Sequence, residues 1–191
     1  MKNLTALALA ATLATLSTAG ARAETATYAI DPTHTFVTFE VRHFGTSTNR
    51  GRFDKKEGAV TLDRAAKTGR VEVTLDTNSI NTGTEPFNAH LKKEFFESAT
   101  YPTAKFVGDQ FSFDGDKITS VTGNLTLHGQ TKPVTLKALN YNCYQNPMLK
   151  REVCGGDFET TITRSDFGIN AMLPFIPDSV HLVIQIEAVK Q

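Results

Sequence analysis

Apolar and polar side chains alternate along most of the chain after residue 24. In one segment Val37, Phe39 and Val41 share one face, while Thr38 and Glu40 share the other. The same period of two, rich in Val, Ile, Thr and Phe, recurs at 58–63, 71–76, 121–127, 134–136 and 180–188. Sustained alternation of this kind is typical of antiparallel strands with one apolar face. We therefore predict an all-β domain of about eight strands.

Short polar segments separate the alternating runs. Lys67-Thr68-Gly69, Asp114-Gly115-Asp116 and His128-Gly129-Gln130 have the composition of hairpin turns. Antiparallel strands joined in this way form either a β-sandwich or a closed barrel with an apolar interior. Closure removes exposed strand edges, and an eight-stranded barrel can hold a ligand. The alternation alone does not choose between the two architectures.

One segment departs from the period of two. Pro86 suits the first turn of a helix, and Phe87, Leu91 and Phe95 then recur at every fourth position. This spacing gives a helix one apolar face, and Tyr101-Pro102 is expected to end it. We predict one short helix that lies across the sheet or across one end of a barrel.

The first residues have the composition of a cleavable signal peptide. Lys2 supplies a positive charge, residues 4–16 are an apolar run of Ala, Leu and Thr, and Ala21-Arg22-Ala23 has the A-x-A form of a cleavage site. The run is shorter than the roughly 20 residues that span a bilayer, which argues against a membrane anchor. We expect residues 1–23 to be removed and residues 24–191 to form one domain outside the cytoplasm.

The mature chain is close to electrical neutrality. Lys2 and Arg22 are two of the 20 basic residues, so 18 basic and 20 acidic residues remain, a net charge of −2. A surface with this balance does not favour nucleic acid or an anionic membrane as a partner.

Cys143 and Cys154 are the two cysteines of the chain. In an exported protein, two cysteines across a short polar stretch favour a disulfide, which would gain roughly 3 kcal/mol from loop closure. A metal site would need further ligands, and none of the five His residues adjoins the cysteines. A redox role is the less favoured alternative, and we expect neither a metal nor a cofactor.

The sequence contains no strong catalytic signature. It has no nucleophile elbow, zinc-protease, C-x-x-C or phosphate-loop motif. Ser165 could serve an envelope hydrolase together with His34 or His181, but nothing marks its hydroxyl as activated. The plainer interpretation is that Arg164 and Asp166 organise the end of a strand. We therefore expect a protein that is not an enzyme.

Three polar side chains are candidates for contact with the headgroup of a ligand. His43 lies on the apolar face of the first long run, and His90 precedes Leu91 on the predicted helix. Arg52 belongs to a basic cluster between the first two runs, where a guanidinium fork would suit phosphate oxygens. The alternatives are hydrogen-bonded histidines of the core or rim and a solvated basic loop.

Phenylalanine is abundant, with 13 residues, and tryptophan is absent. Aromatic residues mostly fill cores, so a solid-core interaction or stress protein is one interpretation. A barrel lined by these rings could instead hold a long hydrocarbon, to which each buried CH₂ would contribute about 0.8 kcal/mol.

Several blocks of the sequence, taken together and in this order, resemble the YceI-like proteins. They are YAIDPTH at 28–34, VTFEVRH at 37–43, GRF at 51–53, NAHL at 88–91, YPTAKF at 101–106, GNLTLHG at 123–129 and RSDFG at 164–168. These blocks are spread over nearly the whole mature chain. The segment with Cys143 and Cys154 departs from the shorter family pattern, and we expect it to decorate a loop.

The resemblance implies an extended, lipocalin-like antiparallel barrel of eight strands with a long hydrophobic cavity. It also implies a periplasmic protein that binds polyisoprenoid or a similar long-chain amphiphilic lipid, without catalysis. For such a ligand, the apolar pattern of the strands and helix gives as expected lining residues Val37, Phe39, Val41, Phe87, Leu91, Phe95, Phe106, Leu125, Leu127 and Leu182. The expected headgroup contacts are His43, Arg52 and His90, and the family motif does not settle them. A transient envelope partner and a homodimer stay open.

Overall fold

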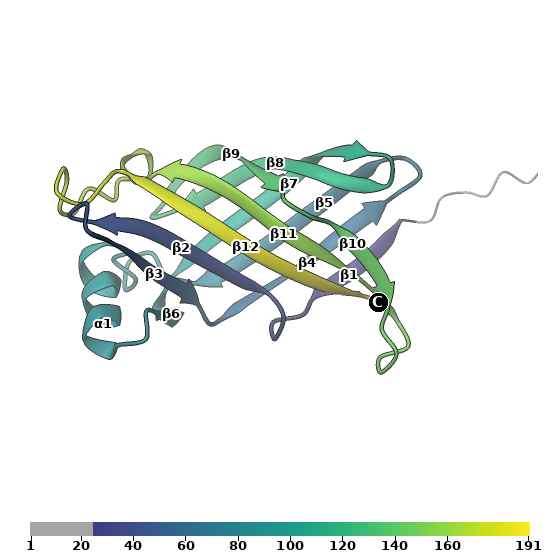
Figure 1. The fold of residues 1–191 in the computed structure, drawn as a ribbon, viewed down its shortest axis with the longest axis horizontal. Helices are drawn as coiled ribbons and strands as arrows, with labels where there is room; N and C mark the ends of the chain where they lie inside the picture. The colour runs from purple at the N-terminus through teal and green to yellow at the C-terminus, as the bar shows by residue number, and fades with distance from the viewer. Residues whose placement is uncertain (1–24) are drawn as a thin grey trace, which may run out of the picture.

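A computed structural model describes residues 25–191, so the predicted signal peptide and its cleavage site lie outside the described residues. Strands make up most of the domain (Figure 1). They are β1 (Ala26–Ile30), β2 (Phe36–His43), β3 (Ser47–Phe53), β4 (Lys56–Asp63), β5 (Thr68–Asp76), β6 (Ile80–Asn81), β7 (Thr103–Asp114), β8 (Lys117–Leu127), β9 (Gln130–Ala138), β10 (Asn142–Gln145), β11 (Glu152–Thr163) and β12 (Ser179–Lys190). The described helical elements are α1 (Glu85–Glu94) and two short 3₁₀ turns, Thr77–Ser79 and Arg164–Phe167.

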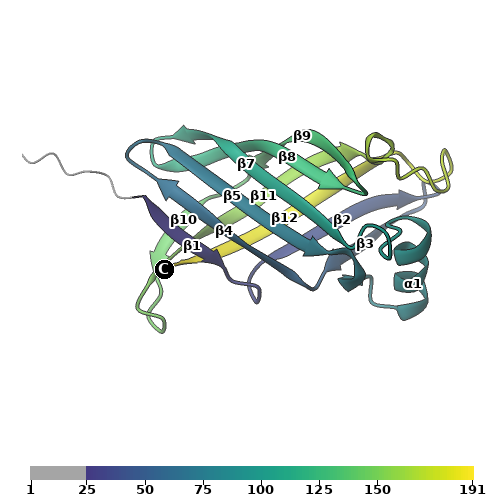
Figure 2. The same ribbon diagram turned by 180° about the vertical axis from the view of Figure 1, so that it is seen from behind.

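The sheet closes on itself, which decides for a barrel over a sandwich. Antiparallel pairing runs in the order β11–β9–β8–β7–β5–β4–β1–β12. β12 then pairs with β11 along the ladder from Val153↔Val189 to Thr163↔Ser179. Eight strands thus form a closed antiparallel barrel, seen from opposite sides in Figures 1 and 2. The predicted fold is confirmed.

The long strand β12 pairs with two strands in succession. Residues 188–190 of β12 pair with β1, and residues 181–185 pair with β2. β2, β3 and β6 therefore continue the wall at one end of the barrel, where α1 contacts β6. We call this end the mouth, formed by the β2–β3 turn, α1 and residues 168–178. The opposite end, with β10 and the β10–β11 turn at 146–151, is the base (Figure 1).

Helix α1 begins at the predicted position, with Thr84 as its N-cap and Pro86 in its first turn. It ends at Glu94, before the predicted stop at Tyr101-Pro102, so the predicted end is wrong. The chain turns away from the helix axis just after Glu94, and Glu97 in this turn takes a left-handed φ of 43°. Neither Pro nor Gly marks this reversal in the sequence. No helix in the described part of the chain is long and apolar enough to cross a membrane.

Two of the three predicted hairpin turns lie where the sequence places them. Leu127 pairs with Gln130, which leaves His128 and Gly129 as a two-residue turn with φ of 50° and 73°. Two positive φ values are typical of the tight turn that matches strand twist, and Gly adopts them without steric penalty. The turn at 114–117 is also as predicted, whereas the turn before β5 occupies residues 64–67 and precedes Gly69.

The base is held by a disulfide and by a polar cluster. Cys143 and Cys154 lie opposite each other in the β10–β11 register and form the predicted disulfide, with their Cα atoms 4.1 Å apart. Glu152 accepts a hydrogen bond from the Tyr28 hydroxyl at 2.6 Å and another from Arg64. Cys143, Glu152 and Cys154 are close enough together for a metal site. The two cysteines are joined in the disulfide, however, so neither sulfur is a thiolate that could bind a metal.

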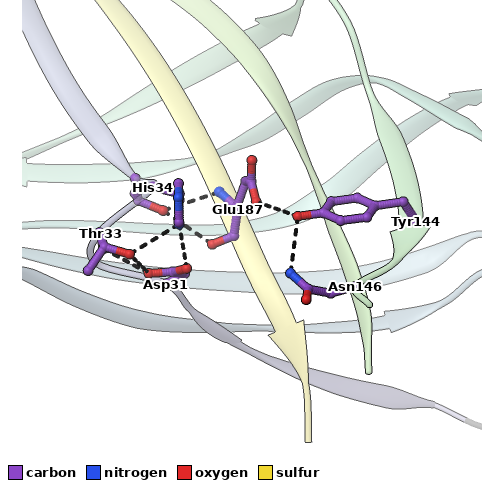
Figure 3. A network of polar contacts seen from close by, with 7 residues as sticks. Asp31, Thr33, His34, Tyr144, Asn146 and Glu187 are labelled. Atoms are coloured by element: carbon purple, nitrogen blue, oxygen red, sulfur yellow. Dashed lines mark hydrogen bonds and ion pairs between the residues drawn. The ribbon is translucent and has the colours of Figure 1, made fainter. Parts of the chain in front are cut away.

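A polar network ties the β1–β2 connection to β12 and β10 (Figure 3). Asp31 accepts hydrogen bonds from the backbone N–H and the hydroxyl of Thr33, at 2.8 and 2.6 Å, and lies 2.7 Å from Nδ1 of His34. Its own N–H donates to the carbonyl of Glu187 at 2.9 Å. The Glu187 carboxylate in turn accepts from the Tyr144 hydroxyl at 3.3 Å. Three segments that are distant in sequence are thereby joined.

The contact between Asp31 and His34 makes stability depend on pH. Burial by itself would raise the pKa of Asp31, but hydrogen bonds from Thr33 and His34 outweigh that effect and lower the pKa to about 2. The Asp31 carboxylate raises the pKa of His34 above its ordinary 6.5. The stabilisation is therefore lost as the pH falls from 3.8 toward about 2, and as the pH rises above 6.5 through the raised pKa of His34.

We expect Asp31→Asn to reduce the dependence of stability on pH in both the acid and the neutral range, because a neutral amide does not titrate and cannot form an ion pair with a protonated imidazole. The measurement is the thermal unfolding midpoint from acid to mildly alkaline pH. Asp116→Asn, at the exposed β7–β8 turn, is the matched control and should keep the wild-type profile. An acid limb equally steep in Asp31→Asn and wild type would contradict the assignment.

Candidate functional site

An apolar cavity of about 310 Å³ lies inside the barrel. Its walls are the inward faces of the ring strands together with residues of β2, β3 and α1. On β12 the lining residues run from Val180 to Ala188, which at about 3.3 Å per residue corresponds to roughly 26 Å. The cavity is therefore elongated and runs along the barrel between the mouth and the base.

All ten residues that the sequence predicts to line a cavity lie on its wall. They are Val37, Phe39, Val41, Phe87, Leu91, Phe95, Phe106, Leu125, Leu127 and Leu182. They come from β2, α1 and its C-cap, β7, β8 and β12, so segments far apart in the chain converge on one interior. Their contact with a ligand stays a prediction.

The wall also includes residues that the sequence analysis did not place there. Val71, Val73 and Leu75 of β5 and Phe158 and Ile162 of β11 line the same cavity. A signal for β5 was present, because its apolar residues alternate in the same way as those of β2. In a closed barrel every ring strand contributes an inward face, whereas the ten predicted residues come from only some of these strands.

Aromatic rings crowd the part of the cavity next to α1. The ring centroid of Phe39 lies 6.3 Å from that of Phe53 and 6.4 Å from that of Phe96, and the last two lie 5.5 Å apart. A Cβ atom at Gly51 would approach the Phe39 ring to 2.4 Å. Glycine at this position of β3 therefore lets the Phe39 ring fill the space inside the wall.

The charged and imidazole groups of the wall lie toward the mouth, and no Asp or Glu of the described chain lines the cavity. The polar residues at the mouth are Arg42, His43, Asn49, His90 and Arg164. Two of the three predicted headgroup contacts, His43 and His90, are thus placed at the cavity. A ligand group that accepts hydrogen bonds or carries negative charge would suit this end.

The third predicted headgroup contact, Arg52, lies outside the cavity. Its Nε donates to Asp54 at 2.8 Å, and its guanidinium lies 5.1 Å from the ring centroid of Phe36. The reason is the alternation of β3, in which Gly51 and Phe53 are buried and Arg52 is exposed. The prediction that Arg52 faces the cavity is therefore wrong, because a cluster of basic residues does not show which face of the strand each residue occupies.

Arg164 is buried at the mouth, with 4% of its surface exposed. Its guanidinium donates to the backbone carbonyls of Pro177, Ile169 and Ile176 at 3.0, 2.8 and 2.9 Å. It also lies 5.6 Å from the ring centroid of Phe95 on the far side of the mouth. Burial lowers the pKa of Arg164. Arg164 organises the end of β11, as the sequence predicts, and in addition lines the cavity. Asp166, predicted to act with it, is exposed, and the carboxylate bonded to this turn is that of Asp178.

The Ser165 hydroxyl is bonded to an aspartate and not to a histidine. Its hydroxyl donates to one carboxylate oxygen of Asp178 at 2.6 Å, and its backbone N–H donates to the other at 2.8 Å. His181 is bonded to two glutamates, and His34 belongs to the Asp31 network. Within residues 25–191, Ser165 is therefore not paired with either histidine of the hydrolase interpretation.

The base end of the cavity is closed by two tyrosines and the disulfide. Tyr28, Tyr141 and Cys154 line it, and Tyr28 has 2% of its surface exposed. Burial raises the pKa of Tyr141 to about 12, so its hydroxyl stays protonated. At the mouth, by contrast, lining residues such as Phe44 are half-exposed. The cavity therefore communicates with solvent at the mouth.

The chain is similar to known proteins both in sequence and in fold. A family model described as YceI-like domain matches residues 28–188. Protein YceI of Salmonella arizonae is 36% identical over 100% of this chain and 98% of the relative. The crystal structure of Burkholderia cenocepacia BcnA matches with a TM-score of 0.69 and 25% identity, over 83% of this chain and 99% of that chain. A polyisoprenoid binding domain from Saccharophagus degradans shares the fold, with a TM-score of 0.60 and 20% identity over 86% of this chain and 98% of that one.

Removing the guanidinium of Arg164 would leave three backbone carbonyls at the mouth without their donor. We expect Arg164→Ala to lower the free energy of unfolding by roughly 3 kcal/mol or more, because hydrogen bonds from a charged group contribute about 1.5–3 kcal/mol and buried acceptors left unpaired cost more. Chemical denaturation measures the loss. Asp166→Ala, at an exposed position of the same turn, is the control. Equal stability of the two variants would contradict this role.

Proposed function

The chain belongs to the YceI-like family, and on that premise we propose that it binds a polyisoprenoid or a similar long-chain amphiphilic lipid inside its barrel. The observation that carries the proposal is the elongated apolar cavity, whose charged lining residues, Arg42 and Arg164, lie at the mouth. An apolar chain would occupy the interior, and the polar end of the molecule would remain at the opening.

The dimensions of the cavity favour a long hydrocarbon over a compact ligand. About 26 Å of continuous apolar wall on β12 allows an extended chain to contact branched and aromatic side chains along its length. Since each buried CH₂ contributes about 0.8 kcal/mol, the hydrocarbon alone can supply tight binding. The Saccharophagus degradans fold neighbour is described as polyisoprenoid-binding. That description supports the chemical class, while the likeness itself establishes a shared fold.

The charges of the wall support an orientation with the headgroup at the mouth. Arg42, His43 and His90 offer hydrogen-bond donors there, and the described wall contains no carboxylate that would repel an anionic group. A headgroup with carbonyl, phenol or phosphate oxygens would match these donors. The base offers the hydroxyls of Tyr28 and Tyr141, but Tyr28 is already bonded to Glu152.

We place this activity in the periplasm. The predicted signal peptide supports export, and the disulfide supports an oxidising compartment. Binding without turnover is supported by Ser165, whose hydroxyl is bonded to Asp178 rather than to a histidine. Carriage of the lipid between the membranes would follow from a barrel that shields the chain from water.

Native mass spectrometry of protein purified from its own periplasm tests the proposal. We expect a mass above that of the polypeptide, and solvent extraction should release a long-chain lipid. Polyprenyl ligand added to delipidated protein should restore the higher mass. A stable ligand-free mass together with no uptake of added polyprenyl ligand would show that the cavity does not have this function.

A pair of substitutions on β12 separates the cavity from the outer surface. Leu182 lines the cavity, whereas its neighbour Val183 does not. We expect Leu182→Gln to weaken binding of a polyprenyl ligand about tenfold or more, because a buried amide without a partner costs roughly 1–3 kcal/mol. Val183→Gln should bind as wild type does in the same titration. Equal affinities of the two variants would exclude the β12 wall as the binding surface.

A further inference from the structure

Three apolar side chains are exposed on two neighbouring loops of the mouth. Phe44 is 52% exposed in the β2–β3 turn, and Met172 and Phe175 are 47% and 65% exposed in residues 168–178. The rings of Phe44 and Phe175 are stacked, with centroids 6.3 Å apart. The two loops therefore present one surface, and we call these three residues the mouth rim.

The mouth rim is continuous with the cavity. Phe44 and Met172 are lining residues of the cavity and are exposed to solvent at the same time. A lipid that entered or left the barrel at this end would therefore pass along these side chains. The apolar surface does not end at the opening but extends outward onto the tips of the loops.

Two of the rim residues occupy backbone positions that apolar residues seldom adopt. Phe44 has a φ of 48° and Met172 a φ of 61°. Phe44 and Gly45 form a tight turn closed by the bond from the Thr46 N–H to the His43 carbonyl at 2.9 Å. Asn, Asp and Gly are the favoured residues at such a position. A large apolar side chain in that place is unfavourable for the isolated protein, and strain of this kind is typical of functional positions.

The two loops that carry the mouth rim contain no Asp, Glu, Lys or Arg around the three exposed side chains. Residues 168–177, GINAMLPFIP, contain no charged side chain, and residues 43–49 contain no Asp, Glu, Lys or Arg. Moving these residues into an apolar environment would bury no charged side chain of their own. The adjoining Arg42 side chain donates to the Gly45 carbonyl at 2.8 Å and can keep its charge at the level of the headgroups. Residues 24–191 carry 18 basic and 20 acidic side chains, so the overall charge of the domain gives no attraction to anionic lipid.

We propose that the mouth rim docks onto a phospholipid bilayer, with Phe44, Met172 and Phe175 at the boundary between headgroups and acyl chains. Three half-exposed side chains of this size expose together roughly 300 Å², whereas each partner in a stable protein dimer buries about 800 Å². A bilayer interface accepts a small apolar surface of this kind and offers the acyl phase directly to the cavity opening. The docking depends on the rim and goes beyond the proposed binding of a lipid in the interior.

The base provides an internal control. Met148 and Leu149 are 89% and 51% exposed in the β10–β11 turn, at the opposite end of the barrel (Figure 1). Neither residue lines the cavity. If exposed apolar residues alone caused membrane contact, the base would bind as well as the rim.

Because the chain contains no Trp, a single substitution creates a specific fluorescent probe. With vesicles of zwitterionic phosphatidylcholine, we expect the emission of Phe175→Trp to shift to shorter wavelength and to be quenched when the acyl chains carry bromine. Met148→Trp should show neither effect. Emission from Phe175→Trp that vesicles leave unchanged, or equal quenching of the two probes, would overturn the proposal.

Vesicle flotation gives a second measurement that does not depend on a probe. We expect the double variant Phe44→Ser, Phe175→Ser to lower the partition coefficient about tenfold or more, with little dependence on salt. The variant Met148→Ser, Leu149→Ser should partition as wild type does. A concentration-dependent dimer that the rim variant abolishes, without vesicle binding by wild type, would identify the rim as a protein interface and overturn the proposal.

Native mass spectrometry of Phe175→Ser, at a rim residue that does not line the cavity, separates the two proposals. Its unfolding midpoint should match that of wild type, since the substituted side chain is 65% exposed. When loaded with polyprenyl ligand in detergent, it should retain the ligand and fail only in exchange with vesicles. Loss of ligand by both wild type and variant would count against the cavity function, whereas exchange at the wild-type rate by the variant would count against the docking.

Discussion

Pairing between β11 and β12 closes the sheet, and the rest of the structure depends on that closure. The ladder runs over nearly the whole of both strands, from Val153↔Val189 to Thr163↔Ser179. Once the ring is closed, every second side chain of each strand must point into a shared interior. An alternating sequence then gives an apolar lumen and a polar outer surface, and no other sequence feature is needed. In an open sandwich the same alternation would bury one face of each sheet against the other and leave no lumen.

The two ends of this lumen differ because different elements close them. At the base, the disulfide fixes β10 on β11, and Glu152 is bonded to Tyr28 and Arg64. The disulfide joins two neighbouring strands, and Glu152 of β11 reaches past β12 to Tyr28 of β1, so these contacts leave little room for passage. At the mouth, a turn, a helix and a long loop replace strand pairing. Side chains there can be half-exposed and still line the interior, as Phe44 is.

The sequence predicts the interior well because strand alternation carries the same information as burial. Each of the ten residues expected on the wall lies there, and the disulfide follows from the position of two cysteines in a β-rich chain for which the sequence predicts export. Arg52 was misplaced because a cluster of basic residues says nothing about the face of the strand on which each one lies. The helix end was misplaced because Glu97 reverses the chain without a Gly or Pro.

The mouth was the least predictable part because it depends on contacts between distant segments. Arg164 illustrates this, since no local pattern shows that its guanidinium would be buried against three carbonyls. The stacking of Phe44 on Phe175 likewise joins two loops that are separated by most of the chain. Periodicity describes one element at a time, and it cannot report such pairings.

The position of Arg164 connects the interior to the exposed surface at its opening. Its three carbonyl partners belong to Ile169, Ile176 and Pro177, on either side of Met172 and Phe175, so the ends of the loop are fixed while its middle projects outward. The same guanidinium lies against Phe95 just beyond α1, which joins the loop to the helix side of the mouth. A loop held in this way presents its apolar side chains without having to be ordered on contact, and less conformational entropy is lost when a surface covers them. The buried charge therefore has a consequence beyond stability, because it keeps the opening of the cavity and the apolar surface around it in a fixed relation.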